Sequence, residues 1–221
     1  MDIETNIREV QRRMAQACER SHRSLDEITL VAITKSVDVS AIRAAFDCGI
    51  SDFGENRVQE AEAKIVQLSD LKPAVTWHMV GHLQSNKAKA AVELFDIIHS
   101  VDSIKLAEIL SWRVEKTLPV LLEVNVSGEA TKGGFSVAEI AAAAKGIRQL
   151  PNLKTMGLMT VAPFVADPEE VRPVFRKLRE LRDSLGLEHL SMGMTDDFEV
   201  AIEEGATMLR IGRAIFGERR Q

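Results

Sequence analysis

The chain has 221 residues, of which 45% are hydrophobic and 28% are charged. This length and composition are typical of one soluble globular domain with a well-buried core. The 28 Lys and Arg residues against 33 Asp and Glu residues give a net charge of −5, so no basic excess predicts binding to nucleic acid or to an anionic membrane surface. We therefore expect a single domain over residues 1–221, with neither nucleic acid nor membrane among its partners.

The first residues, 1–4, are Met-Asp-Ile-Glu and lack the positive flank and apolar stretch of a signal peptide. No apolar run approaches the length of a membrane span. These two observations predict a cytoplasmic protein. Cys18 and Cys48 show neither pairing nor metal-ligand spacing, so we interpret both as reduced structural thiols.

Hydrophobic periodicity predicts an amphipathic helix over residues 2–20, followed by a strand-helix unit that recurs to the end of the chain. Eight short apolar runs are predicted strands, at residues 29–33, 52–53, 76–80, 97–101, 120–126, 155–159, 189–192 and 208–211. Helical periods lie between them at residues 39–48, 57–68, 104–116, 137–150 and 168–185. The last of these begins with a proline, which a first helical turn tolerates.

Eight alternating units indicate a closed parallel barrel. The competing architecture is a doubly wound open sheet, which usually carries a glycine-rich turn after its first strand. Residues 34–38, Thr-Lys-Ser-Val-Asp, contain no glycine. We therefore predict an α/β fold, a (β/α)8 TIM barrel with an extra N-terminal helix, near the short end of the size range of that fold, about 200 residues upward.

Lys35 stands where the first predicted strand runs out into a polar stretch. A lysine at the carboxyl end of a buried strand can lose its proton by desolvation and attack a carbonyl group. The chain contains no tyrosine, so it lacks the phenol that several lysine-dependent racemization sites need as a second acid or base. Together these facts predict a site that holds an aldehyde cofactor, although a solvated lysine at a strand end is the alternative interpretation of Lys35.

In a TIM barrel the chemistry collects on loops after the carboxyl ends of the strands, and phosphate is often held after the seventh and eighth. Chemically useful residues follow that rule here, at Lys35, Asn56, His78, Asn125, Ser191, Thr195, Arg210, Gly212 and Arg213. Gly193 permits close approach of the backbone, Thr195 offers a hydroxyl just before a helix predicted to begin near Asp197, and Gly212 leads into residues 213–215. These residues predict a phosphate-binding cradle.

Two other patterns have simpler interpretations. We interpret Asp196, Asp197 and Glu199 as helix-capping acids, because Asp196 and Glu199 have the spacing of a capping box. His78 and His82 are four residues apart, but the predicted strand ends between them and no carboxylate or thiolate joins them, so no metal site is predicted. Core packing or polarity near the substrate accounts for His78.

Several sequence blocks in order resemble a known family, namely those at residues 30–35, 53–56, 59–61, 77–87, 157–160, 191–194, 210–212 and 215–217. The chain resembles the YggS-like family of pyridoxal phosphate homeostasis proteins, which are single-domain relatives of the alanine racemase barrel. The resemblance runs nearly end to end and implies pyridoxal 5′-phosphate as the cofactor. It also implies a monomer, because it carries no obligate partner domain.

The resemblance implies a role for several residues. Lys35 would hold the cofactor as a Schiff base, Thr195 with the amides around Gly212 and Arg213 would hold the phosphate, and Arg210 would face the pyridine nitrogen. Thr195 stands where serine is usual in the family, which keeps a hydroxyl.

A second departure from the family pattern is Arg57, which stands where tyrosine is expected. Any role of an aromatic ring at that position is therefore missing from this chain.

The guanidinium of Arg210 cannot accept a proton from the pyridine nitrogen, whereas the carboxylate of an aminotransferase-type site keeps that nitrogen protonated. We therefore predict a carrier or buffer of pyridoxal phosphate, which passes the cofactor transiently to apo-enzymes and influences amino-acid and keto-acid metabolism. Two alternatives remain open. One is a weakly active racemase that uses Lys35 with water or His78, and the other is a class I aldolase in which Lys35 attacks a sugar ketone.

Overall fold

The computed structural model describes residues 2–129 and 131–217. Within these ranges the strands are β1 Thr29–Ile33, β2 Asp52–Glu55, β3 Thr76–Met79, β4 Ile97–Val101, β5 Leu118–Asn125, β6 Phe135–Ser136, β7 Leu153–Met159, β8 His189–Ser191 and β9 Met208–Ile211. They form one parallel sheet in the order β4-β3-β2-β1-β9-β8-β7-β5-β6. An additional pairing of β4 with β5 closes the sheet into a barrel, so the predicted (β/α)8 TIM barrel is confirmed.

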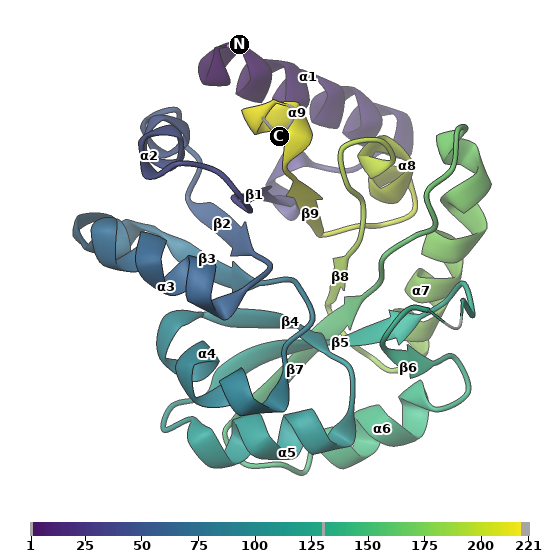
Figure 1. Ribbon diagram of the computed structural model, residues 1–221. Helices are drawn as coiled ribbons and strands as arrows, with labels where there is room; N and C mark the ends of the chain where they lie inside the picture. The colour runs from purple at the N-terminus through teal and green to yellow at the C-terminus, as the bar shows by residue number, and fades with distance from the viewer. Residues whose placement is uncertain (1, 130, 218–221) are drawn as a thin grey trace.

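The helices surround the strands (Figure 1). Their bounds are α1 Ile3–Ser21, α2 Val39–Asp47, α3 Val58–Gln67, α4 Ala88–Leu94, α5 Ile104–Arg113, α6 Ile140–Ile147, α7 Arg172–Ser184, α8 Phe198–Glu203 and α9 Arg213–Phe216. Short 3-10 turns cover Leu25–Glu27, Ser69–Ala74, Ser85–Lys87 and Pro168–Val171. Among the described residues, no helix combines the length and the apolar character needed to cross a membrane.

Two elements differ from the sequence prediction. The helix predicted over residues 168–185 is divided, with a 3-10 turn at Pro168–Val171 before α7. Pro173 lies in the first turn of α7 and has no N–H to donate to the carbonyl four residues earlier, so the α-helical ladder begins there anew. The two-residue strand β6, which pairs only with β5, was not predicted.

The N-terminal helix α1 covers the barrel beside α8 and α9 (Figure 1). Asn6 Nδ2 donates to the carbonyl of Ile215 at 2.8 Å, and the guanidinium of Arg13 lies 4.6 Å from the ring centroid of Phe198. The buried face of α1 repeats every three or four residues, as a one-sided helix requires, and consists of Ile7, Val10, Met14, Ala17 and Cys18. Because α8 and α9 have only six and four residues, α1 supplies much of the cover that a longer eighth helix would give.

The apolar residues form two groups. The larger one packs the helices against the outer face of the barrel. The smaller one, Leu121, Met159 and Met208 with Ile97 and Met156 packed against it, comes from β5, β7, β9 and β4 and fills part of the barrel interior. Side chains that fill a small barrel lie in layers, and the interior also holds a polar layer, described below, through which the two ends of the barrel are connected.

Candidate functional site

Lys35 follows β1 in a tight turn at the carboxyl end of the barrel. The amide of Thr34 still donates to the carbonyl of Gly54 on β2 at 2.9 Å, and the next residue but one, Ser36, has a positive φ of 59°. Few non-glycine residues adopt this conformation, so the turn is held by its surroundings. Lys35 is half-buried, and the structure gives its amine no hydrogen bond or ion pair within the described residues.

A buried ionic cluster holds the backbone on both sides of Lys35. Lys64 Nζ, on α3, donates to the carbonyl of Thr34 and to Glu55 Oε1, both at 2.6 Å, and to Glu60 Oε1 at 2.9 Å. Glu55 is fully buried and also accepts from the hydroxyl of Thr34 at 2.6 Å, while Glu60 accepts from the amide of Ser36. The position of the turn therefore depends on three charged side chains that lie behind it.

Sequence reasoning missed the part that Lys64 has in this cluster. Its signal was present, because Lys64 lies in the buried stripe of α3 with Val58, Ala61 and Ile65. A lysine in an apolar stripe is found buried only when it is paired. The partner acids belong to blocks that carried the family resemblance, but their pairing with Lys64 depends on the packing of α3 against β2.

Arg210 is buried in the barrel interior, with 5% of its surface exposed. Its Nη1 donates to Ser191 Oγ at 2.6 Å and its Nη2 donates to the carbonyl of Thr160 at 2.8 Å. Burial lowers the pKa of Arg210 to about 10, against the attraction of Asp197 and Glu123, which raises it. The guanidinium is thus still protonated at neutral pH, and its orientation is fixed by two acceptors.

The interior also contains two histidines that are hydrogen-bonded to each other. His99 Nδ1 lies 2.8 Å from Ser191 Oγ, His99 Nε2 lies 2.9 Å from His78 Nδ1, and His78 Nε2 lies 3.0 Å from Asp52 Oδ1. Both rings are fully buried. The prediction that His78 points toward the rim with the other site residues is wrong, because its ring reaches Asp52 at the first position of β2, at the opposite end of the barrel. His99 was not singled out from the sequence.

The segments after β8 and β9 meet beside the end of β1. Gly193 has a φ of +92°, and a Cβ there would lie 2.6 Å from the Cβ of Ala201, so glycine is required. Thr195 Oγ1 accepts from the amide of Ala214 at 3.4 Å. A Cβ on Gly212 would lie 3.4 Å from Ile33, which places this turn against the strand that leads to Lys35.

The acidic residues of this segment do not form the predicted capping box. Asp196 pairs with Arg213 at 2.6 Å, and Glu199 pairs with Arg13 of α1 at 2.8 Å. Asp197 Oδ1 accepts from the amide of Met194 at 2.6 Å, and burial raises the pKa of this carboxyl group. The capping interpretation is wrong because distant arginines, which the local sequence does not reveal, take the two carboxylates. The predicted start of the helix near Asp197 is correct.

The other predicted site residue, Asn56, follows β2 and is half-buried. Its backbone lies against Gly81, where a Cβ would approach the carbonyl oxygen of Asn56 to 2.4 Å. His82, beyond β3, is exposed and pairs with Asp102 at 2.9 Å, so it diverges from the buried His78. Within residues 2–129 and 131–217 no group of three or more potential ligands could hold a metal ion.

Four adjacent strands therefore carry the predicted cofactor residues. In the sheet order β2-β1-β9-β8, they belong to these strands or follow them, and they are Asn56, Lys35, Arg210, Gly212, Arg213, Ser191 and Thr195. The structure brings the amine of Lys35, the hydroxyl of Thr195 and the guanidinium of Arg213 to the ends of adjacent strands, while Arg210 and Ser191 are buried in the barrel interior.

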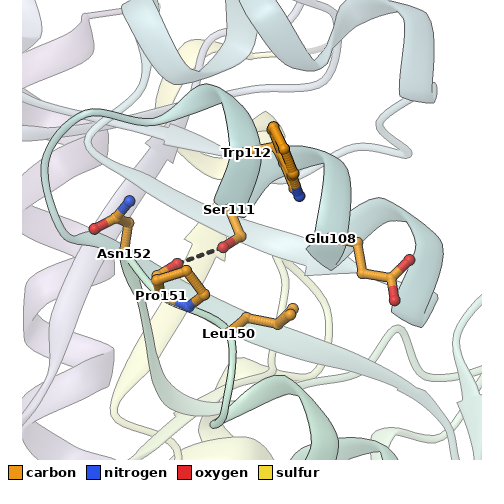
Figure 2. A pocket seen from close by; sticks show the side chains of 6 residues that line it. All are labelled: Glu108, Ser111, Trp112, Leu150, Pro151 and Asn152. Carbon is orange, nitrogen blue, oxygen red and sulfur yellow. Dashed lines mark hydrogen bonds between the residues drawn. The ribbon is translucent and has the colours of Figure 1, made fainter.

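Two hollows on the protein surface lie elsewhere. One of about 450 Å³ is lined by Glu108, Ser111, Trp112, Leu150, Pro151 and Asn152, where α5 ends and β7 is about to begin (Figure 2). Trp112 is 90% exposed there. This hollow is at the amino-terminal end of the strands and offers a single carboxylate, so we do not assign the chemistry to it.

Similar proteins and a family model identify the family of this chain. The family described as alanine racemase, N-terminal domain, matches residues 2–220. The pyridoxal phosphate homeostasis protein of Aquifex aeolicus is 46% identical over 217 residues, which cover 94% of each chain. The chain belongs to the pyridoxal phosphate homeostasis protein family. The resemblance inferred from the sequence blocks is thereby confirmed.

Solved structures of relatives have the same fold. An unknown protein from Bifidobacterium adolescentis matches with a TM-score of 0.90 at 38% identity, over 97% of this chain and 94% of that one. PipY of Synechococcus elongatus, solved with pyridoxal phosphate bound, matches with a TM-score of 0.80 at 38% identity, over 94% of this chain and all of that one. Family members of this fold thus include one that holds pyridoxal phosphate.

Proposed function

We propose that this protein binds pyridoxal 5′-phosphate through a Schiff base on Lys35 and acts as a carrier or buffer in cytoplasmic pyridoxal phosphate homeostasis. In this role it influences amino-acid and keto-acid metabolism by supplying apo-enzymes transiently, and it acts as a single-domain monomer. The observation that carries the proposal is that the half-buried Lys35 follows β1, the strand against which the Gly212 turn is packed. The membership of the family and the cofactor bound to PipY support it.

The donor set fits the cofactor. A phosphate dianion needs hydrogen-bond donors and positive charge, and Thr195, the amides that begin α9 and Arg213 offer both. Asp196 pairs with Arg213 at 2.6 Å, so this arginine is shared between the carboxylate and any anion that enters. Asn56, on the other side of β1, offers a further amide group. The aldehyde of the bound cofactor supplies an electrophile for the amine of Lys35.

A carrier fits this site better than a racemase. Arg210 is protonated and acts only as a donor, so it leaves the ring nitrogen without a proton and weakens the cofactor as an electron sink. A racemase also needs a second base opposite the lysine, and the chain has no tyrosine. Both ring nitrogens of His78 are taken by Asp52 and His99, which makes this histidine unsuitable as the second base.

The proposal is tested by spectroscopy on the purified protein. We expect a yellow protein whose visible band is removed by borohydride, with the reduced adduct found on Lys35 by mass spectrometry. Lys35→Ala should lose the band and keep the circular dichroism spectrum, while Lys154→Ala, at the opposite end of the barrel, should keep both. An adduct on another lysine would overturn the assignment, and a colourless protein that borohydride traps with a sugar phosphate would indicate the aldolase.

A further inference from the structure

A continuous row of hydrogen-bonded side chains crosses the barrel interior from β2 to β9. It begins at Asp52, the first residue of β2, whose side chain is 23% exposed, and continues through His78 of β3 and His99 of β4 to Ser191 of β8. From Ser191 it reaches Arg210 of β9 at 2.6 Å. The link between solvent at the amino-terminal end and the candidate site thus has no apolar gap.

The chemistry of the end groups fixes the direction of every hydrogen bond. Arginine can only donate and an ionised carboxylate can only accept, so Arg210 donates to Ser191 and His78 Nε2 donates to Asp52. Neutral His78 then has a bare Nδ1, which accepts from His99 Nε2. His99 Nδ1 is in turn bare and accepts the hydroxyl proton of Ser191. This arrangement satisfies all of these groups with both histidines neutral.

The reverse arrangement needs either a repulsive contact or one more proton. If His99 donated from Nδ1 to Ser191, its Nε2 would have to accept from His78 Nδ1. His78 would then face the Asp52 carboxylate either with a bare nitrogen, which repels it, or as a cation. An additional positive charge near the site is costly because Arg210 already lies at the other end of the row.

The surrounding charges agree with the neutral arrangement. Burial lowers the pKa of His99 well below its ordinary value, and the positive charge of Arg210 lowers it further. Burial raises the pKa of Asp52, but hydrogen bonds from His78 and Ser51 outweigh this and keep its carboxyl group ionised at neutral pH.

Charges also face the Arg210 end of the row. The carboxyl groups of Asp197 and Glu123 attract the guanidinium, and burial together with Asp102 raises the pKa of Glu123. At the other end of the row, the carboxyl group of Asp52 is ionised.

We propose that Asp52, His78 and His99 are positioning residues for Arg210. Through their hydrogen bonds and the hydroxyl of Ser191, the charge of Asp52 influences the bound cofactor. The proposal rests on the proposed function, because Arg210 acts here on the ring of bound pyridoxal phosphate. It goes beyond that function by assigning a task to three residues that bind nothing themselves. The row of hydrogen bonds keeps Ser191 available as an acceptor, so Nη1 and Nη2 of Arg210 keep their hydrogen bonds to Ser191 and to the carbonyl of Thr160.

The first test needs no cofactor. Histidine labelled with ¹⁵N in the apo-protein distinguishes the two neutral tautomers by the chemical shifts of the ring nitrogens. We expect His99 and His78 both to carry their proton on Nε2 near neutral pH, and Ser191→Ala to allow the second tautomer of His99 to appear, with Ser191→Thr restoring the first. A wild-type His99 protonated on Nδ1 would overturn the proposal.

The second test uses the holo-protein and a double-mutant cycle. Asp52→Asn keeps an acceptor for His78 but removes the charge, so the pH midpoint of the cofactor's visible absorbance should move down by roughly half a unit, a threefold change in proton affinity. In the Ser191→Ala background the same substitution should move it by less than about 0.2 unit. Asp70→Asn, an exposed carboxylate paired with Arg43, removes an equal charge and should leave the midpoint unchanged.

The possible results distinguish a failure of this inference from a failure of the proposed function. If Asp52→Asn shifts the pH midpoint equally with and without the Ser191 hydroxyl, the charge acts through space. If Asp52→Asn does not shift the midpoint, the charge has no effect at the site. Either result overturns the inference. If wild type shows no visible band, the proposed function has failed, and the tautomers in the apo-protein still decide whether the row of hydrogen bonds has this direction.

Discussion

Arg210 is the residue on which the proposed chemistry of the cofactor depends most. A buried guanidinium is costly unless its donors are satisfied, and here Ser191 and the carbonyl of Thr160 satisfy two of them. Even with the pKa lowered to about 10 by burial, Arg210 remains a cation at neutral pH. In the proposed site, Arg210 would stabilise a lone pair on the ring nitrogen of the cofactor but would not leave a proton there, which would suit storage of the cofactor better than carbanion chemistry.

Thr195 provides a test of the phosphate cradle at the same scale. Thr195→Ala should weaken pyridoxal phosphate binding by about 0.5–3 kcal/mol, the range for loss of a hydrogen bond to a neutral or charged group, and Thr195→Ser should restore it. Titration followed by visible absorbance measures the affinity. Pyridoxal without phosphate should bind wild type and Thr195→Ala equally, and an equal loss for both ligands would show that the hydroxyl is not at the phosphate.

At the scale of elements, the sequence predicted the strands better than the interactions between them. The apolar runs 29–33, 97–101 and 208–211 coincide with β1, β4 and β9, because a strand buried on both faces has a composition that can be read locally. Lys64 and His99 could not be interpreted in that way. Glu60 is four residues from Lys64, but the other partners of Lys64 lie 9 and 30 residues away and those of His99 lie 21 and 92 residues away. The full set of contacts therefore forms only when the barrel has closed.

The same limit explains the errors around the site. Asp196 and Glu199 have a local spacing that predicts capping, but Arg213 and Arg13 are brought to them by α9 and α1. His78 was placed at the rim because it lies late in its strand, whereas its ring is directed by Asp52 and His99. The roles of Lys35, Thr195 and Arg210 came from the resemblance and stay predictions.

The cluster of Lys64, Glu55 and Glu60 connects helix α3 to the Lys35 turn, and its energetics can be measured. Lys64→Met leaves Glu55 buried at 0% exposure without its cation, so we expect a loss of about 3–5 kcal/mol in the free energy of unfolding. Lys64→Met with Glu55→Gln should recover part of it, because the uncompensated charge is gone. Urea denaturation measures both, and a loss below about 1 kcal/mol, the range of surface ion pairs, would contradict the buried character of this pair.

At the scale of the whole molecule, the barrel separates stability from binding. The apolar cluster of Leu121, Met159 and Met208 and the outer core fill the fold, while the candidate cofactor residues belong to four adjacent strands at one side of the mouth. Loops at the carboxyl ends of barrel strands can carry function without disturbing the core. The chain contains no tyrosine that could act on a substrate at this side of the barrel.

We predict that the protein transfers its cofactor to other proteins and does not catalyse racemization with it. Incubated with L- or D-alanine in deuterated water, the holo-protein should exchange the α-hydrogen slowly or not at all, far below the usual enzymatic range of about 1–10³ s⁻¹. The reasons are the missing tyrosine base and the ring nitrogen that Arg210 leaves unprotonated. Mixed with an apo-enzyme that requires pyridoxal phosphate, it should restore that enzyme's activity while its own visible band declines, and Lys35→Ala should not do so. Rapid deuterium uptake with inversion, lost in Lys35→Ala, would overturn the carrier and establish a racemase.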